Sequence, residues 1–198
     1  TFPAFRQLKV PVANTFSSKL QSPSLSEGSH QDLSLESTLW DLPLYEFQVK
    51  SSCLAVTVAQ IFEQHPLVPG VVLLEAGEFA GMISRRQLLE YLLKPQGPEL
   101  FLHLPLKVLY SYARVEILLV AESTTILTAA PQALRGSPEL QSEPIVVQID
   151  SQSYCLLDTP ALNIAYWQIR GIETQVRHAR AKTDTIQDEK MPSLARLD

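Results

Sequence analysis

The sequence predicts a mixed α/β fold of the α+β kind, built from two strand–helix–strand–strand–helix repeats and extended by a C-terminal coiled-coil helix. Three observations lead to this prediction. A strand-rich segment recurs without a gap later in the chain, and similar strand and helix patterns precede both copies. A heptad pattern of small and apolar residues then runs through the C-terminal region.

The internal repeat aligns residues 71–84 with residues 145–158. Each copy has the pattern of a buried strand, a polar turn, a second short strand and the start of a helix. The turns are Ala76-Gly77-Glu78 and Asp150-Ser151-Gln152, and these residue types favour a hairpin. Two such hairpins in one chain predict two related units.

Matching elements flank each hairpin. The expected strands are Tyr45–Val49 and Ile117–Val120, and the expected closing helices are Gln87–Leu93 and Pro160–Trp167. Thr57 and Thr125 can cap the helices between the strands, and Asp158 or Thr159 can cap the last one. The repeats therefore cover about residues 43–93 and 116–168, joined by a connector with one amphipathic piece, Leu104–Tyr112.

The chain before the repeats is expected to differ from them. Asn14–Ser37 is rich in Ser and poor in large apolar groups, so it cannot bury enough surface to offset its ordering entropy. We therefore predict a flexible linker over residues 1–41, a regulatory domain over 42–168 and a helical stalk over 169–198.

Composition excludes several classes of protein. The net charge of −5 argues against a nucleic-acid surface, which needs a cationic stripe. The longest apolar runs are far shorter than the ~20 residues of a membrane span, and Thr1–Val10 lacks the core of a signal peptide. Cys53 and Cys155 are too few for a disulfide framework and are expected to be buried thiols. These features predict a cytoplasmic protein.

The segment Gly81-Met82-Ile83-Ser84-Arg85-Arg86-Gln87-Leu88-Leu89, with its repeat, resembles the CBS-domain pair, or Bateman module, over about residues 43–168. The resemblance implies two sheets packed face to face, with clefts that often bind adenine nucleotides. The ribose-binding Asp of that family corresponds to Gln87 and, in the second repeat, to Ala161. Neither residue offers a carboxylate for the ribose hydroxyls.

The resemblance also implies a set of candidate ligand-binding residues. They are Val49, Thr57, Ser84, Arg85, Arg86, Gln87 and Thr125. Ser84 to Arg86 stand where a phosphate could meet a helix N-terminus. The alternative is that both arginines are solvated residues of a first helical turn.

The heptad pattern, here called the seam, consists of small and apolar residues three and four positions apart. They are Leu162, Ala165, Ile169, Ile172, Val176, Ala179, Thr183 and Ile186. Such spacing favours parallel pairing of two helices, so we predict a homodimer through the seam. The alternative is one amphipathic helix that folds back on the repeats, and Gly171 weakens the helix in either case.

The last five residues suggest the kind of domain that the stalk leads into. Leu194-Ala195-Arg196-Leu197-Asp198 resembles the lead-in to a GGDEF diguanylate cyclase domain, and a histidine kinase is the alternative. The leading hypothesis is thus a bacterial, non-catalytic sensory and dimerisation module that controls a downstream output domain, with an adenine nucleotide or another small ligand between its repeats.

Two other classes of function remain open at this point. One is a ligand-free structural dimerisation or docking module. The other is a small hydrolase or redox enzyme that uses Cys53 or Cys155. The four histidines lack the spacing of a metal site, and Trp40 and Trp167 are expected to be packing anchors.

Overall fold

The structure is a computed structural model that describes residues 24–25, 33–112 and 116–190, with side chains as far as His178. The lead-in at residues 194–198 and most of the predicted linker lie outside this part of the chain. So do the side chains of Ala179, Thr183 and Ile186, which belong to the predicted seam.

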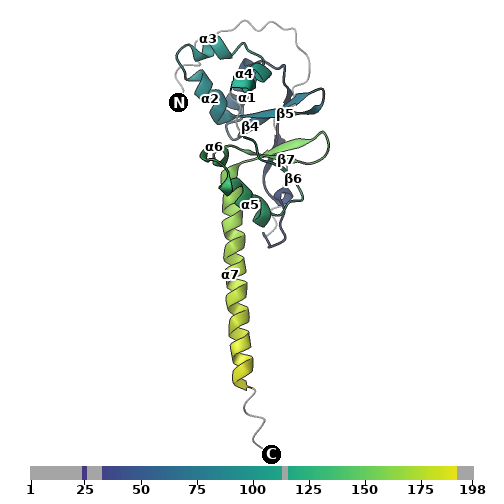
Figure 1. The fold of residues 1–198 in the computed structure, drawn as a ribbon, viewed down its shortest axis with the longest axis vertical. Coiled ribbons are helices and arrows are strands. Elements are labelled where there is room, and N and C mark those ends of the chain that lie inside the picture. The colour runs from purple at the N-terminus through teal and green to yellow at the C-terminus, as the bar shows by residue number, and fades with distance from the viewer. Residues whose placement is uncertain (1–23, 26–32, 113–115, 191–198) are drawn as a thin grey trace, which may run out of the picture.

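Two units of similar topology make up the domain (Figure 1). The first contains β3 (Gln48–Lys50), α1 (Ala55–Gln64), β4 (Gly70–Glu75), β5 (Glu78–Ser84) and α2 (Arg85–Leu92). The second contains β6 (Leu119–Ala121), α5 (Ile126–Arg135), β7 (Ile145–Gln148), β8 (Tyr154–Leu157) and α7 (Thr159–Lys190). The remaining elements are β1 (Ser24–Leu25), the short 3₁₀ helix η2 (Leu39–Asp41), β2 (Leu44–Glu46), α3 (Gly97–Phe101), α4 (Leu106–Tyr112) and α6 (Pro138–Gln141).

Strand register confirms the gapless repeat. In the first unit β3 runs parallel to β4, and β5 returns antiparallel with Ile83 opposite Val71. In the second unit β6 runs parallel to β7, and β8 returns with Leu157 opposite Ile145. Equivalent residues of the two copies face equivalent partners as far as Leu73 and Val147. A register shift between Leu73 and Leu74 then places Leu74 opposite Phe79, whereas Gln148 lies opposite Tyr154. The shared topology confirms the α+β fold with two repeated units.

The two hairpins turn by different means. The first has a two-residue turn in which Ala76 and Gly77 have φ angles of 54° and 90°, the left-handed geometry of tight hairpins. In the second, Asp150 Oδ1 accepts hydrogen bonds from the backbone nitrogens of Gln152 and Ser153, both at 2.8 Å. Hydrogen bonds to the Asp150 carboxylate therefore stabilise the second turn, whereas the first turn depends on two residues with positive φ angles.

The single strand predicted at Tyr45–Val49 is in fact two strands. Phe47, which is 1% exposed, separates β2 from β3, and the two strands enter different sheets. β2 pairs with β8 in a sheet of order β1-β2-β8-β7-β6, whereas β3 pairs with β4 in the sheet β3-β4-β5. The chain thus crosses from the second unit to the first at this phenylalanine.

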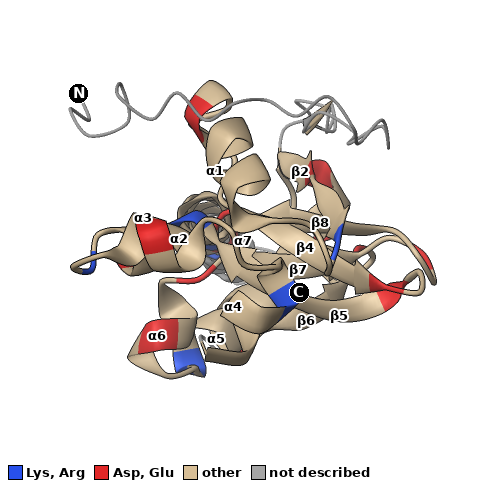
Figure 2. Ribbon diagram, turned by 90° about the horizontal axis from the view of Figure 1, so that it is seen from above, with Lys and Arg blue, Asp and Glu red and all other residues tan. Residues whose placement is uncertain are grey.

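The two sheets meet through their own apolar cluster. Val72, Met82, Val146 and Leu156 are each at most 2% exposed there, and Tyr154 is 4% exposed. Seen from above, acidic and basic positions are scattered around the two units outside this contact (Figure 2). The repeats therefore pack face to face, as the sequence resemblance implies.

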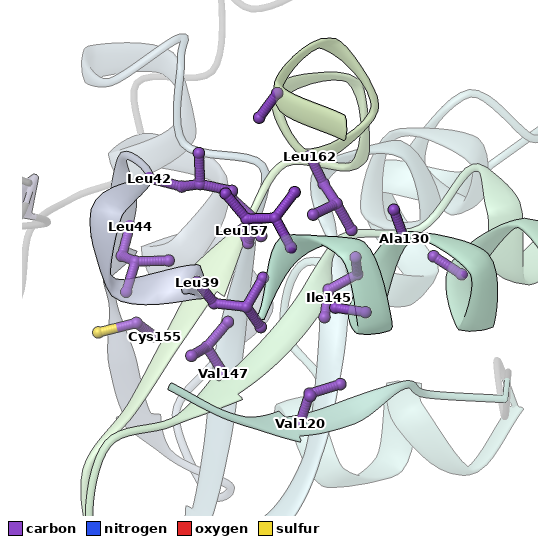
Figure 3. Packing of buried hydrophobic residues seen from close by; sticks show 14 of the residues in the cluster. Leu39, Leu42, Leu44, Val120, Ala130, Ile145, Val147, Cys155, Leu157 and Leu162 are labelled. Carbon is purple, nitrogen blue, oxygen red and sulfur yellow. The ribbon is translucent and has the colours of Figure 1, made fainter. Parts of the chain in front are cut away.

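The described end of the predicted linker is packed onto the second unit. Leu39 is fully buried and lies in one cluster with Leu44, Ile145 and Leu157 (Figure 3). Its backbone nitrogen donates to Thr124 O at 3.0 Å. The folded part therefore begins before Leu42, the residue at which the sequence pattern predicts its start.

The last helix of the second unit continues into the stalk without a break, so α7 is a single helix of 32 residues (Figure 1). Leu162, Ala165 and Ile169 are each at most 3% exposed and belong to the core of the second unit. The prediction that the two tryptophans anchor the packing is wrong, because Trp40 is 50% and Trp167 65% exposed.

Candidate functional site

The N-terminus of α2 is closed by its own residues. Ser84 Oγ accepts a hydrogen bond from the Gln87 backbone nitrogen at 3.1 Å, and Gln87 Oε1 accepts one from the Ser84 nitrogen at 3.3 Å. Both side chains are buried. This reciprocal capping box satisfies two backbone donors, so the side chains of Ser84 and Gln87 are both already engaged in hydrogen bonds within α2.

Arg85 is bound to the end of α1. Its Nε donates to Val68 O at 2.9 Å, its Nη1 donates to Phe62 O at 2.7 Å, and its Nη2 donates to His65 O. The guanidinium also lies 4.6 Å from the centre of the Phe62 ring. Burial lowers the pKa of Arg85. Arg85 is thus a structural cap of α1 and not a solvated residue of the first turn.

Arg86 joins the two units. Its Nη2 donates to Glu143 Oε1, and its Nη1 lies 3.7 Å from Glu90 Oε2. The Glu143 side chain is fully buried, whereas that of Arg86 is 49% exposed. Arg86 comes from the first unit and Glu143 precedes β7 of the second, so this ion pair crosses the junction.

Glu143 also contacts the start of α7. Thr159 Oγ1 donates to Glu143 O at 2.6 Å, and Thr159 is itself 5% exposed. Glu143 Oε2 is buried and has no hydrogen-bond partner among the described residues. No local sequence pattern predicted a role for Glu143, because its ion-pair partner, Arg86, lies 57 positions away in the chain.

The remaining candidate ligand residues are spread over three elements. Val49 is buried in the core of the first unit, on β3. Thr57 lies inside α1, which begins at Ala55, so it does not cap that helix. Thr125 is the N-terminal cap residue of α5 by backbone geometry, but its hydroxyl lies 2.9 Å from Thr128 Oγ1 and makes no capping bond.

A small hollow lies between α1 and α2 on the first unit. Its volume is about 90 Å³, and its walls include Ala59 and Phe62 of α1 and Leu88 and Leu92 of α2, with Arg85 among them. Because these walls are mainly apolar, the hollow fits an apolar group better than a phosphate.

The two thiols have an environment that opposes nucleophilic chemistry. Burial raises the pKa of the Cys155 thiol to about 11, with Glu46 and Glu122 adding to the effect. Burial also raises the pKa of Cys53. Reactive cysteines need a lowered pKa, so both shifts run against the enzyme hypothesis.

We expect Cys155 to react slowly with iodoacetamide. A pKa two units above the ordinary value of 9.0 leaves about 100-fold less thiolate at pH 8, and burial slows the reaction further. The measurement is the alkylation rate of the Cys53→Ala variant, compared with the same chain in urea. Equal native and unfolded rates would contradict this assignment.

The free energy of unfolding should also fall between pH 9 and 11. In this range the Cys155 thiol ionises in the unfolded chain but stays largely protonated in the folded one, so rising pH favours unfolding. Urea denaturation at a series of pH values measures the change.

Within the described residues, no group of three or more His, Cys, Asp or Glu side chains is placed to hold a metal ion. The helices in that part of the chain include none that is both long and apolar enough to cross a membrane.

Searches with family models and among curated proteins find no match. Several solved structures are similar in fold. An AcuB-type protein assigned to acetoin utilization in Vibrio cholerae has 12% identity and a TM-score of 0.49, covering 75% of this chain and 98% of that one. A CBS domain-containing protein from Kribbella flavida has 15% identity and a TM-score of 0.47, and the match covers 59% of this chain and 88% of that one. CBSX2, solved with AMP, has 19% identity and a TM-score of 0.47, and the match covers 68% of this chain and 98% of that one. Similarity of this extent says nothing about a shared ligand or activity.

Proposed function

We propose that this chain is a non-catalytic, cytoplasmic regulatory module of the CBS-pair type that controls a downstream output domain through α7. The observation that carries the proposal is the continuity of α7, which begins at the junction of the two units and runs well beyond them. A rigid element of this kind transmits a change at the junction over a distance, because a helix moves as one body.

The contacts at the junction support this role. Arg86 of the first unit binds Glu143, and Glu143 O accepts from Thr159, the first residue of α7. A ligand that shifts the first unit against the second would act on this chain of contacts and hence on the start of α7. Such a ligand works only if it binds one arrangement of the units more tightly than the other.

The ligand proposed for the junction is an adenine nucleotide or a related small molecule. The proposal rests on the CBS-like repeat, and the exposed part of Arg86 is the group suited to a phosphate. Against it, Gln87 occupies the position of the ribose-binding Asp and is engaged in the capping box. The second candidate is therefore a ligand-free dimerisation and docking module. It is favoured because Gln87 is held in the capping box and Arg85 is held by the backbone carbonyls at the end of α1, so neither side chain is free for a ligand.

A thermal-shift series separates the two candidates. We expect ATP, ADP or AMP at millimolar concentration to raise the melting temperature, because a ligand that binds only the folded state stabilises it. S-adenosylmethionine and cyclic dinucleotides extend the series. Arg86→Ala should reduce the shift, because it removes the group proposed to bind a phosphate, whereas Lys107→Ala, at another half-exposed cation, should not. A flat response to every compound would leave the ligand-free module.

We further propose that the output domain is a diguanylate cyclase, with a histidine kinase as the alternative. This rests on the resemblance of residues 194–198 to the lead-in of a GGDEF domain. The coding sequence downstream of Asp198 in the gene tests it. A GGDEF opening supports the cyclase, and a kinase dimerisation helix supports the alternative.

A further inference from the structure

The hollow between α1 and α2 has an apolar floor and is open on one side. Phe62, Leu88 and Leu92 form the floor and are each at most 6% exposed, whereas Ala59 and Leu89 are only partly buried. A closed cavity of about 150 Å³ holds a whole benzene ring. This open hollow of about 90 Å³ therefore admits the greater part of one aromatic side chain.

Exposed apolar side chains lie at both ends of the hollow. Leu67 and Leu93 are 77% and 75% exposed, the highest values among the large apolar residues that the structure describes. Leu67 is next to Val68, whose carbonyl binds the lining residue Arg85, and Leu93 follows the lining residue Leu92. An apolar hollow with exposed leucines at its two ends is typical of an interaction surface.

The edge of the hollow carries an unpaired negative charge. Glu63 of α1 lines the hollow, is exposed and takes part in none of the ion pairs between described residues. The cation in the lining, Arg85, already donates to three backbone carbonyls. The hollow therefore favours an apolar occupant with a positive charge beside it.

One segment of the chain before β1 has this composition. Phe2, Phe5 and Leu8 follow one another at steps of three. Arg6 and Lys9 lie among and after them, and no Asp or Glu precedes β1. Segments that dock between helices commonly present apolar anchors at such intervals.

Strand pairing directs the chain before β1 towards the first unit. β1 is antiparallel to β2, with Ser24 opposite Glu46, so the N-terminal end of β1 points the same way as the C-terminal end of β2. β2 leads into the first unit through Phe47, whose ring centre lies 6.1 Å from that of Phe62 in the hollow. Lys9 precedes Ser24 by 15 positions. A chain of that length spans about 20 Å as a flexible coil and about 50 Å when extended, which is enough to reach the hollow.

We propose that residues 2–9 dock in the hollow between α1 and α2, with Phe5 seated between its apolar walls and Arg6 and Lys9 near Glu63. The docked segment covers the groove between the two helices that Arg85 joins. It also ties the chain that precedes β1, a strand of the second unit's sheet, to the first unit. This contact needs neither the ligand nor the homodimer of the proposed function.

Trypsin cleavage after Lys9 in the folded full chain tests the docking, because a docked segment must leave the hollow before a protease can bind it. Each rate is divided by that of a free peptide of the same sequence, residues 1–16. We expect the wild-type chain to be cleaved on the order of tenfold more slowly than its peptide, and Phe5→Ala to remove most of this protection. Phe16→Ala, at a phenylalanine outside the segment, should leave the protection unchanged.

A second set of variants changes the hollow and leaves the segment intact. Ala59→Trp fills the hollow and should speed cleavage as Phe5→Ala does, whereas Gln132→Trp, at an exposed position of α5, should not. Glu63→Lys reverses the charge beside the segment and should speed cleavage about threefold, whereas Glu139→Lys on α6 should not. Circular dichroism checks that each variant is folded.

Three outcomes overturn the docking. One is a wild-type chain that is cleaved as fast as its free peptide. Another is protection that Phe5→Ala and Ala59→Trp leave intact, because the segment is then held elsewhere. The third is a change of association state, measured by sedimentation, that Ala59→Trp causes and Phe5→Ala does not, because a second copy of the chain then occupies the hollow.

Discussion

Replacing Arg86 by Ala is expected to lower the free energy of unfolding by about 3 kcal/mol, the low end of the range for breaking a buried ion pair. The substitution would leave the Glu143 carboxylate fully buried without its charged partner, and its Oε2 already has no hydrogen bond within the described chain. The half-exposed Arg86 side chain places the effect at the low end, because water can partly replace it. Urea denaturation with a linear extrapolation measures the change.

Two further variants separate the buried pair from the surface pair. Glu90→Ala removes the other partner of Arg86, which is 60% exposed, and should cost at most about 1 kcal/mol. Glu143→Leu added to Arg86→Ala removes the buried charge itself and should recover much of the loss. A loss below 1 kcal/mol in Arg86→Ala, or a double variant no more stable than the single one, would show that this ion pair does not hold the units together.

Arg85→Ala should be the second large effect, with a loss of about 3 kcal/mol. It removes the hydrogen bonds to Phe62 O, His65 O and Val68 O and the stacking on the Phe62 ring. Hydrogen bonds from a charged donor contribute about 1.5–3 kcal/mol each, and water replaces part of that where the carbonyls become exposed. Arg85→Lys should recover little, because an ammonium group cannot span three carbonyls as a planar guanidinium does.

A matched control for Arg85 is Lys94, whose ammonium lies 4.2 Å from the centre of the Tyr91 ring. Lys94→Ala removes a cation–π contact alone and should cost no more than about 1 kcal/mol at this exposed site. If the Arg85 and Lys94 variants lose the same stability, the carbonyl hydrogen bonds of Arg85 contribute little and its role as the cap of α1 is refuted.

Local patterns in the sequence were sufficient to predict the two repeated hairpins. The alignment of residues 71–84 with 145–158 matches the observed pairing from the open end of each hairpin to Leu73 and Val147, because alternation and turn chemistry act over a few neighbouring residues. It did not show the register shift after Leu73. The same patterns could not show that the chain changes sheets at Phe47. Both halves of residues 45–49 have strand character, and the partner of each half comes from a distant segment.

In the candidate site, too, local features could be predicted from the sequence and long-range contacts could not. Ser84 and the start of α2 follow from a capping pattern that spans four residues, Ser84 to Gln87. The roles of the two arginines do not, because Arg85 meets carbonyls about twenty positions upstream and Arg86 meets Glu143 across the junction. In the seam, periodicity marks an apolar stripe on α7 but cannot tell whether α5 or a second chain covers it.

By itself, therefore, the sequence determined the two repeated units, the correspondence between their hairpins and the long terminal helix, because short-range hydrogen bonding and side-chain periodicity specify these features. Only the tertiary structure decided that Arg85 caps α1 and that Glu143 binds Arg86. It also decided that the first three seam residues, Leu162, Ala165 and Ile169, belong to the core of the second unit. Those outcomes depend on which distant groups meet in space, and burial then determines which charges must be paired and which apolar faces remain open.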